Sequence, residues 1–406
     1  MKRGDIGNEF LKYKEMFSQD KILCVYGYGI EGKRLAGIIG TSQKIRLFDK
    51  RYTMDSLGRV PENSSMEDLK WRMTDGQKRF SDSLWGGVES PTIIASLNKN
   101  KHILVVCMNE VNSIYSMNML IRQGWKLGTN LFSYRDFIEH FFTLYMFFHD
   151  KLLYAQNVTI SISKKCTLKC IDCSQKMPYQ KGLKDEKLLD IIATVDSFFN
   201  LVDFVENIAV TGGEPLLRSD ICEILEEICK HKEAFGNMRI VTNGTIIPSE
   251  YLLDYIKSEN ITLEVTDYSV GLSRINEIER LCINKKIPFI RNKHPYWFRM
   301  WGRKNENPVW QYDMCISASH CDGLIDGRYT RCLCAYYWSL ATNHDDNDDY
   351  FQLHNQSESL MNQKEKLFDY MNGLTTKKGY LTACEYCGGL YGVNDEYVDV
   401  AKQIDE

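Results

Sequence analysis

Short apolar runs alternate with amphipathic segments along most of the chain, in two separate blocks. In the first block, the runs KILCVYG, KIRLFD and HILVVC predict buried strands, while KRLAGIIG and VNSIYSMNMLIRQG have the apolar spacing of helices. Strands that alternate with helices are typical of a parallel sheet. We therefore expect an α/β domain over residues 1–150, with about three clear strands.

A second block begins with the strand segment NVTISIS at residue 157 and continues through VENIAVTGG, MRIVTNG, ITLEVTD and IPFIR, with a helical segment after each of the first four. This repetition predicts an α/β fold with a partial (β/α)6 TIM-like barrel, which we assign to residues 151–310. The pattern fails after about residue 295, and the remainder contains a predicted hairpin at GLIDGRYTRC and a predicted helix at 358–372. We expect residues 311–406 to form a small Cys-rich domain.

Composition and charge narrow the functional classes. The net charge of −4 indicates neither a nucleic-acid partner nor an anionic membrane surface. The beginning of the sequence has no apolar core of signal-peptide length. The run from Phe137 to Phe148 is interrupted by Glu139 and His140, and it is too short for a membrane span of about 20 residues. We expect a cytoplasmic protein in which this run is a buried aromatic helix.

The chain has 14 cysteines, and nine of them lie in two groups. In a cytosolic protein, clustered cysteines indicate metal binding or catalysis more often than disulfides. The other five sit singly in apolar runs, where cysteine is an ordinary core residue: Cys24, Cys107, Cys222, Cys229 and Cys282.

The first group has the spacing Cys166-x3-Cys170-x2-Cys173 and directly follows a predicted strand. In β/α barrels the loops at the carboxyl ends of the strands carry the chemistry. Three thiolates this close in sequence can bind three irons of a 4Fe–4S cluster and leave the fourth iron open to a ligand. Structural zinc is the alternative, but it prefers four ligands and this loop supplies three.

Three motifs, each at the end of a predicted barrel strand, carry a family resemblance: CTLKCIDC at 166–173, TGGEP at 211–215 and VTNG at 241–244. Residues 155–295 are thereby similar to the radical S-adenosylmethionine (SAM) enzymes. The resemblance implies that the open iron chelates the amino and carboxylate groups of SAM. It also implies that an electron from the cluster cleaves SAM to methionine and a 5′-deoxyadenosyl radical, which abstracts a substrate hydrogen. One departure is Asp172, where many members of the family have an aromatic residue.

The same resemblance implies a SAM-binding set. Gly212, Gly213 and Glu214 would line the methionine amino group, and Thr242 and Asn243 would lie near the ribose. Glycines at a strand end also suit the close approach of a ligand to the backbone.

The second cysteine group comprises Cys315, Cys321, Cys332, Cys334, Cys384 and Cys387. From spacing alone, Cys384-x2-Cys387 is a chelating pair, and zinc and iron–sulfur centres are equally compatible with it. In the context of the first group, the set resembles the Twitch domain, a shortened SPASM domain. That resemblance implies an auxiliary 4Fe–4S cluster in an electron-transfer role. Its ligands would be Cys315, Cys332, Cys384 and Cys387, with Cys321 as an alternative to Cys315.

A glycine-rich loop, Gly27-x-Gly29-x-x-Gly32, follows the first predicted strand, and Asp49 ends the next one. This is the dinucleotide-binding pattern of a tight turn, a helix N-terminus for a pyrophosphate and a carboxylate for a ribose. The domain resembles small Rossmann-like modules of glycan-modifying enzymes, which implies a nucleotide or nucleotide-sugar site. The alternative is that the glycines serve packing alone.

The segment at 291–310 mixes cations with aromatic residues, and it follows the last barrel repeat. Arg291, His294, Arg299 and Arg303 are candidates to hold a phosphate or carboxylate of the substrate. The alternative is a linker whose tryptophans pack between domains.

These observations favour a radical SAM oxidoreductase with two 4Fe–4S clusters. We expect it to oxidise a hydroxyl-bearing carbon of a sugar, cyclitol or nucleotide-sugar, with a flavodoxin or ferredoxin as reducing partner. One alternative is radical modification of a peptide or protein, although no winged-helix-like docking region is recognisable. A second alternative is a zinc-stabilised binding protein without catalysis.

Overall fold

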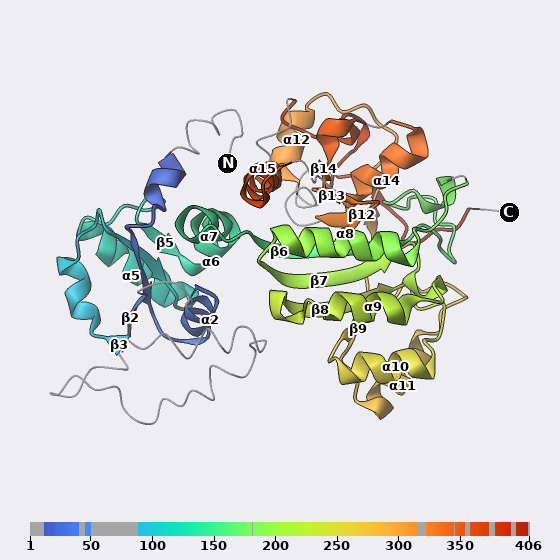
Figure 1. The fold of residues 1–406 in the computed structure, drawn as a ribbon, viewed down its shortest axis with the longest axis horizontal. Helices are drawn as coiled ribbons and strands as arrows, with labels where there is room; N and C mark the ends of the chain where they lie inside the picture. The colour runs from blue at the N-terminus through green and yellow to red at the C-terminus, as the bar shows by residue number, and fades with distance from the viewer. Residues whose placement is uncertain are drawn as a thin grey trace. The chain divides into compact units, whose positions relative to one another are not determined.

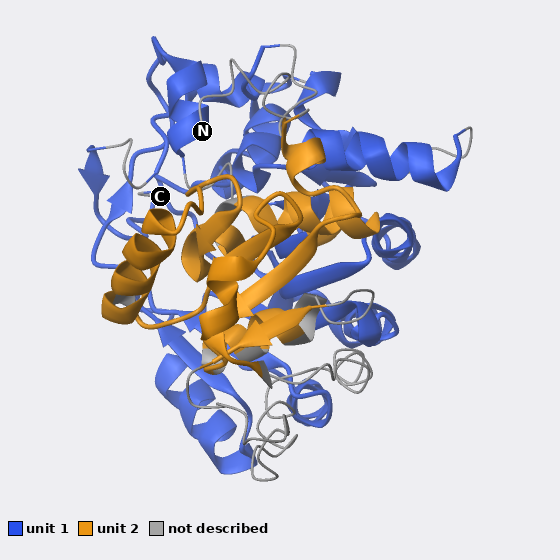
Figure 2. Ribbon diagram, turned by 90° about the vertical axis from the view of Figure 1, so that its left-hand side faces the viewer, with its two compact units in different colours: residues 1–6, 155–406 blue, residues 7–154 orange. Residues whose placement is uncertain are grey.

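The computed structural model describes residues 12–39, 45–49, 88–180, 182–315, 322–344, 346–353, 358–372, 378–390 and 395–404. The chain divides into two compact units, which Figure 2 colours separately. One unit is Gly7–Tyr154, and the other comprises Met1–Ile6 and Ala155–Glu406. The division into three domains, with a further boundary at residue 310, stays a prediction.

The smaller unit is built on a parallel sheet whose described strands have the order β3-β2-β1-β4-β5. This is the order of a Rossmann-like half, with the reversal of strand order beside β1. The strands are β1 (Ile22–Tyr26), β2 (Arg46–Phe48), β3 (Val88–Glu89), β4 (His102–Val106) and β5 (Leu131–Ser133). The sequence predicted β1, β2 and β4; it did not predict β3 and β5, which have two and three residues.

Helices α2 (Ile30–Ile39) and α5 (Glu110–Arg122) connect these strands (Figure 1). The apolar run at 137–148 is helical and largely buried, as predicted, and it consists of a π-helical turn, Phe137–Phe141, followed by α7 (Phe142–Asp150). Phe17 packs against Phe132 and Phe137 of this unit. None of the helices within the described ranges combines the length and hydrophobicity that a membrane crossing requires.

The larger unit contains the partial barrel. Its sheet has the described order β10-β9-β8-β7-β6-β12-β13-β14, and β7 to β10 pair in parallel. The barrel strands are β6 (Tyr154–Ser163), β7 (Phe204–Gly212), β8 (Phe235–Thr242), β9 (Thr262–Thr266) and β10 (Phe289–Asn292). The helices between them are α8 (Leu188–Leu201), α9 (Ile221–Cys229), α10 (Glu250–Ser258) and α11 (Ile275–Lys285), which line one side of the sheet in Figure 1.

The predicted hairpin joins this sheet. Strands β12 (Gly323–Ile325) and β13 (Arg328–Thr330) are antiparallel, and the turn residues Asp326 and Gly327 both have positive φ, as a two-residue hairpin turn requires. Strand β12 pairs in parallel with β6, and β14 (Phe351–Gln352) extends the sheet beyond β13. The barrel sheet therefore gains a parallel strand from the cysteine-rich part of the chain, which the sequence did not predict.

The remaining elements surround the cysteines of the second group. They are α12 (Pro308–Met314), α14 (Leu333–Thr342), α15 (Leu360–Met371) and the 3-10 helix η9 (Thr382–Tyr386). Helix α15 confirms the helix predicted at 358–372. A short antiparallel pair, β11 (Trp297–Phe298) and β15 (Tyr397–Val398), ties the segment after the barrel to the last described residues.

Candidate functional site

The first cysteine loop begins where β6 ends and is held by the end of β7. The Gly213 N–H donates to Ser163 O at 2.8 Å, and the Glu214 N–H donates to Lys165 O at 2.7 Å. A Cβ atom on Gly213 would lie 2.2 Å from Lys165 O, and one on Gly212 would lie 2.3 Å from Ser163 O. The two glycines are therefore required because the backbone of the cysteine loop passes so close to them.

Glu214 connects the TGGEP motif to the VTNG motif. Its Oε1 accepts from Thr242 Oγ1 at 2.8 Å and from Leu216 N at 2.9 Å, and its Oε2 accepts from Asn243 N at 2.8 Å. The side chain is fully buried, which raises the pKa of its carboxyl, while these hydrogen bonds act in the opposite direction. The carboxylate thus fixes the ends of β7 and β8 relative to each other. The expected contacts of Gly212, Gly213 and Glu214 with SAM stay a prediction.

Asn243 connects the VTNG motif to the cysteine loop in turn. Its Nδ2 donates to Thr167 Oγ1 at 3.0 Å and lies 3.6 Å from Cys166 Sγ. Its Oδ1 accepts from Thr245 Oγ1 at 2.7 Å, and the hydroxyls of Thr167 and Thr245 are 2.6 Å apart. The three sequence motifs therefore form one hydrogen-bonded site. Sequence reasoning missed both threonines, and the ribose-side position of Thr242 and Asn243 stays a prediction.

Cys166, Cys170 and Cys173 pack together, against Leu168 and Tyr268. Burial raises the pKa of all three thiols, and that of Cys170 to about 11. The nearby sulfurs add to this, because each thiolate disfavours a second negative charge beside it. A positively charged iron centre reverses this preference by taking the place of the protons. This set of three converging thiols fits a cysteine-bound iron–sulfur cluster.

Three of the four candidate substrate-binding residues are engaged in ion pairs. Arg291 pairs with Asp267 at 2.7 Å. Arg299 pairs with Glu396 at 2.7 Å and with Asp172 at 3.4 Å. Asp172 stands directly before the third cysteine, where many radical SAM enzymes have an aromatic residue. Through Arg299 it therefore connects the segment after the barrel to the cysteine loop.

Arg303 is the third ion-paired candidate, and it also pairs with Glu396, at 2.8 Å. His294 is half-buried and follows β10 by two residues. It therefore lies just beyond the carboxyl end of a barrel strand, on the side of the sheet where the cysteine loop also begins.

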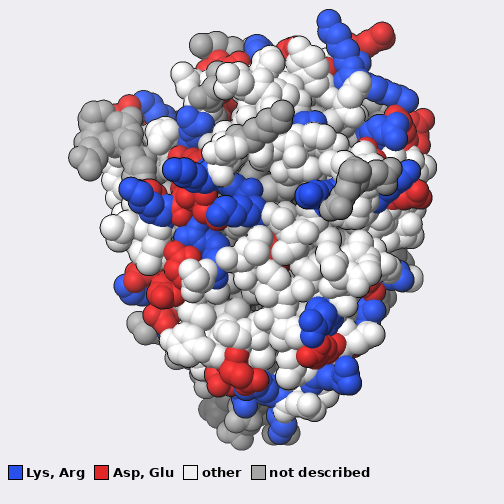
Figure 3. Space-filling model, turned by 90° about the vertical axis from the view of Figure 1, so that its right-hand side faces the viewer, with Lys and Arg blue, Asp and Glu red and all other residues white. Residues whose placement is uncertain are grey.

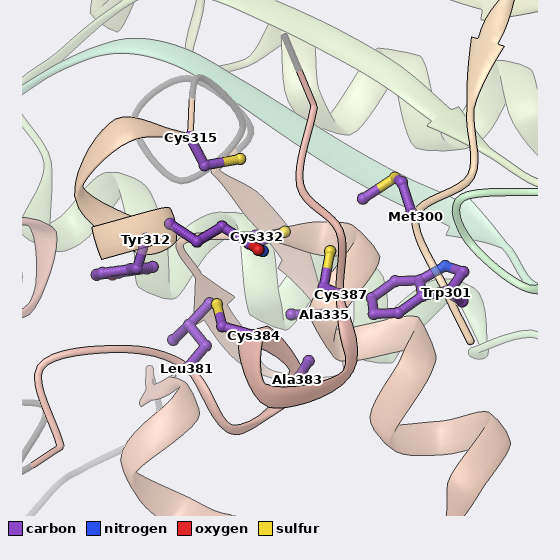
Figure 4. Close-up of a pocket in the computed structure, with 11 residues that line it drawn as sticks. Met300, Trp301, Tyr312, Cys315, Cys332, Ala335, Leu381, Ala383, Cys384 and Cys387 are labelled. Carbon is purple, nitrogen blue, oxygen red and sulfur yellow. The ribbon is translucent and has the colours of Figure 1, made fainter. Parts of the chain in front are cut away.

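Four cysteines of the second group line one pocket. Figure 4 shows Cys315, Cys332, Cys384 and Cys387 around a single space, with Trp301 at its edge. They come from the end of α12, the start of α14, η9 and the residue after η9. The set that the sequence resemblance implied is therefore brought together from segments up to 72 residues apart in the chain, from 315 to 387.

Two further cysteines were considered for this site. Cys321 lies outside the described residues, so its choice as an alternative to Cys315 stays open. The Cys334 side chain is hydrogen-bonded to Cys332 and, together with burial, raises the pKa of the Cys332 thiol.

The remaining lining of the pocket is mostly apolar, from Tyr312, Ala335, Leu381 and Ala383 among others. Burial raises the pKa values of Cys384 and Cys387. Within the described ranges, no three His, Cys, Asp or Glu side chains are grouped closely enough to hold a single metal ion. A 4Fe–4S cluster has thiolates on separate irons and spaces them more widely, so this apolar four-thiol pocket fits such a cluster.

Trp301 touches both cysteine sites. Its indole Nε1 donates to Ser174 O, next to Cys173, at 2.8 Å. Its backbone forms an antiparallel bridge with Cys387, and its ring stacks on Trp338 with centroids 6.1 Å apart. Sequence reasoning foresaw tryptophans packed between domains only as an alternative, and it did not single out this one.

Helix α14 makes a second connection between the sites. Tyr336 and Tyr337 pack with Met177 beside Cys166 and Cys173. The residues directly before and after these two tyrosines, Ala335 and Trp338, pack against the four-cysteine pocket. One helix and one indole ring therefore contact both cysteine sites.

The glycine-rich loop of the smaller unit joins β1 to α2. The Asp49 carboxylate is buried and accepts from the Tyr28 N–H at 2.7 Å. A Cβ on Gly27 would lie 2.3 Å from Cys107 O, and one on Gly32 would lie 2.0 Å from Gly27 O. Packing alone thus explains Gly27 and Gly32. A ligand at Gly29 and Asp49 stays a prediction.

The single cysteines are largely core residues, as expected: Cys24, Cys107, Cys222 and Cys282 are buried, and Cys229 is half-buried. On the face shown in Figure 3, Lys and Arg side chains are interspersed with Asp and Glu around a broad uncharged area. Neither sign of charge dominates that face, which agrees with the small net charge of the chain.

Comparison with known proteins identifies the barrel segment. Residues 160–294 match the model of the Radical SAM superfamily. A GTP 3′,8-cyclase from Campylobacter jejuni subsp. doylei is 30% identical over 119 residues, which cover 27% of this chain and 35% of that protein. A probable GTP 3′,8-cyclase from Methanocaldococcus jannaschii is 32% identical over 124 residues, which cover 30% of this chain and 35% of that protein. The chain spans about a third of the length of these curated relatives.

Two solved structures are more distant. BtrN in complex with AdoMet and 2-DOIA has a TM-score of 0.41 and 15% identity, with 62% of this chain and 98% of that chain covered. The enzyme anSMEcpe with bound AdoMet has a TM-score of 0.27 and 21% identity, with 34% of this chain and 43% of that chain covered. Similarities at this level do not assign a substrate.

Proposed function

Because the chain carries a radical SAM domain and belongs to the radical SAM superfamily, we propose that it is an oxidoreductase that dehydrogenates a hydroxyl-bearing carbon. The superfamily implies SAM and a 4Fe–4S cluster as cofactors. We assign that cluster to Cys166, Cys170 and Cys173, which converge on one loop at the carboxyl end of the first barrel strand. The substrate class that we favour is a sugar, cyclitol or nucleotide-sugar.

When bound and reduced, the cluster supplies the electron that splits SAM into methionine and a 5′-deoxyadenosyl radical, which takes a hydrogen atom from the substrate carbon. The hydroxyl of that carbon then gives up a proton to a base, and one electron leaves to an acceptor. The balance is one SAM and one alcohol converted to methionine, 5′-deoxyadenosine, a ketone and a proton, with the starting electron returned. The protein must therefore supply a base and an electron acceptor.

The pocket of Cys315, Cys332, Cys384 and Cys387 is the observation that carries this proposal. An auxiliary 4Fe–4S cluster there would have a protein ligand for every iron, which suits electron transfer better than substrate binding. Trp301 and α14 contact both this pocket and the first cysteine loop, so an electron would cross few residues between the two sites. These contacts support the acceptor role of the pocket.

His294 is the base that we favour. The guanidinium groups of Arg291, Arg299 and Arg303 remain protonated in proteins and are paired with carboxylates, so they suit binding rather than proton removal. A neutral imidazole carries one acceptor nitrogen, which can take the hydroxyl proton. The position of His294 just after β10 supports this choice, since barrel enzymes bind substrate at that end of the strands.

The Rossmann-like unit supports a nucleotide-bearing substrate. Its strand order and glycine-rich loop are those of nucleotide-binding sheets. The names of the GTP 3′,8-cyclase relatives also refer to a nucleotide, but the partial coverage supports only the shared radical chemistry. We propose a flavodoxin or ferredoxin as the reducing partner and a cytoplasmic location.

Label transfer tests the proposal. Nucleotide-sugars, free sugars and cyclitols deuterated at hydroxyl-bearing carbons are incubated with the reconstituted protein, SAM and dithionite, beside a panel of peptides. Deuterium in 5′-deoxyadenosine from a sugar or cyclitol, with a ketone product, supports the proposal. Transfer from peptides alone replaces it with peptide modification. A colourless protein that contains zinc and no iron after anaerobic purification would leave only a non-catalytic binding protein.

A further inference from the structure

A segment near the last described residues lies directly on the first cysteine loop. The Ile171 N–H donates to Lys402 O, and the Ile404 N–H donates to Lys169 O, both at 2.8 Å. Cys170 and Gln403 form an antiparallel bridge between these two contacts. Ala401 is buried against Leu168 and Cys170. This backbone pairing fixes segment 401–404 beside the middle one of the three cysteines.

The side chain of Gln403 turns toward Cys170. Its Nε2 lies 3.3 Å from Cys170 Sγ and donates to Ala401 O at 2.6 Å. Its Oε1 accepts from the Lys169 N–H at 2.7 Å. A backbone N–H can only donate, so it requires the amide oxygen on its side and leaves the NH₂ group to face the sulfur. The orientation of the amide is therefore set by the cysteine loop itself.

We propose that Gln403 is a positioning residue that donates an N–H···S hydrogen bond to the Cys170 ligand of the SAM-binding cluster and raises the reduction potential of that cluster. The inference rests on the proposed assignment of this cluster to Cys166, Cys170 and Cys173. Hydrogen bonds to cluster sulfurs are one of the factors that set such potentials. The reduced cluster carries one more negative charge than the oxidised one, so a donor at a ligand sulfur stabilises the reduced form more.

The donors at Cys166 come from the sequence motifs themselves. Cys166 Sγ accepts from the Leu168 N–H at 3.4 Å and lies 3.6 Å from Asn243 Nδ2. Gln403 is 233 residues from Cys170 in sequence. It thus makes the potential of the cluster depend on a segment outside the barrel motifs. Since SAM cleavage needs an electron from this cluster, the contact would affect how readily the reductant can start the reaction.

The test is an anaerobic redox titration of both clusters by electron paramagnetic resonance, in the wild type and in Gln403→Leu. Leucine keeps the backbone pairing of the segment but has no donor. We expect unchanged iron content and about a tenfold lower ratio of reduced to oxidised SAM-binding cluster at a fixed potential, which is about 59 mV for one electron. The signal of the auxiliary cluster should keep its midpoint. Both signals should also be unchanged in the control Gln363→Leu, a residue of α15 whose amide donates to Glu358 O.

A midpoint that stays within error of the wild type, at full iron content, overturns the inference and leaves the proposed function intact. If Gln403→Leu loses iron, Gln403→Met offers a side chain of more similar shape, again without a donor. Loss of iron in both variants overturns the inference as well, because Gln403 would then be needed for assembly alone. The proposed function fails separately if replacing Cys166, Cys170 and Cys173 removes no iron.

Discussion

The two cysteine sites of the larger unit are built in opposite ways. The first uses three cysteines within eight residues on one loop, and hydrogen bonds from the ends of β7 and β8 hold that loop. The second uses four cysteines from three parts of the chain, in a pocket with few polar contacts. A loop at the end of a barrel strand supplies ligands from one side, whereas the pocket supplies them from three parts of the chain around one space.

This difference agrees with the separate roles that we propose for the two sites. The loop offers three thiols, so a 4Fe–4S cluster there would keep one iron for SAM, and the polar motifs around the loop supply further hydrogen-bonding groups. The pocket offers a thiol for every iron and apolar walls, which suit a centre that only gains and loses an electron. The predictions below test whether the two sites are separate in this sense.

The largest effect is expected for the triple variant Cys166→Ala, Cys170→Ala, Cys173→Ala. Without thiolates on the loop, no cluster can bind SAM, so 5′-deoxyadenosine should fall to the background without enzyme. Chromatography of the reaction with dithionite and SAM measures it. Cys229→Ala, a half-buried cysteine on α9, is the matched control and should keep wild-type production. Normal cleavage in the triple variant would remove the loop from the mechanism.

Cys384→Ala with Cys387→Ala should separate the two halves of the reaction. The loop is intact, so SAM cleavage in the presence of substrate continues. Oxidised product should be lost, because the substrate radical has no acceptor for its electron. Mass spectrometry of 5′-deoxyadenosine and ketone in the same sample measures the ratio. An unchanged ratio would mean that the pocket takes no part in the oxidation.

A pH-dependent effect on stability is expected at the charged residues beside the first cysteine loop. Lys164, beside the cysteine loop, pairs with Asp326 of the hairpin turn at 2.6 Å. Burial, with the nearby Asp326 carboxylate, raises the pKa of Glu186 from 4.5 to about 7. A raised carboxyl pKa favours the protonated form in the folded state. Its contribution to stability is therefore complete below about pH 4.5 and is lost as the pH rises through 7.

Glu186→Gln stays neutral at all pH values and avoids this loss. The variant should gain up to about 3 kcal/mol in stability relative to the wild type between pH 5 and pH 8, the upper limit for a shift of this size. Thermal unfolding at both pH values measures the difference. Glu223→Gln, on the exposed side of α9, should show no such trend. A relative stability of Glu186→Gln that does not change with pH would contradict the assigned pKa.

The smallest effect is expected for Trp301→Phe, which removes the indole N–H bonded to Ser174 O. The loss of one hydrogen bond to a half-buried carbonyl should cost about 1 kcal/mol. Iron content should stay at the wild-type level, since Trp301 is not a ligand. Trp310→Phe, an exposed residue of α12, is the control. Loss of auxiliary iron in Trp301→Phe alone would mean that the indole holds the pocket together.

The same contrast explains what the sequence could reveal. The loop was predictable because its ligands and the following motifs are local and lie at the ends of periodic strands. Trp301 and Gln403 were not, because their partners lie 127 and 233 residues away in the chain. The pocket needed a family resemblance, since the spacing of its cysteines left zinc and iron–sulfur equally open. The pairing of β12 with β6 was missed because three residues carry no register signal.

Metal content tests the central claim of two separate clusters most directly. Iron and zinc are measured after anaerobic reconstitution in the wild type, the triple loop variant and the Cys384→Ala, Cys387→Ala variant. Two 4Fe–4S clusters predict about eight irons in the wild type and about four in each variant, without zinc. Zinc in the triple variant, or iron that disappears completely when either site is changed, would contradict two independent clusters.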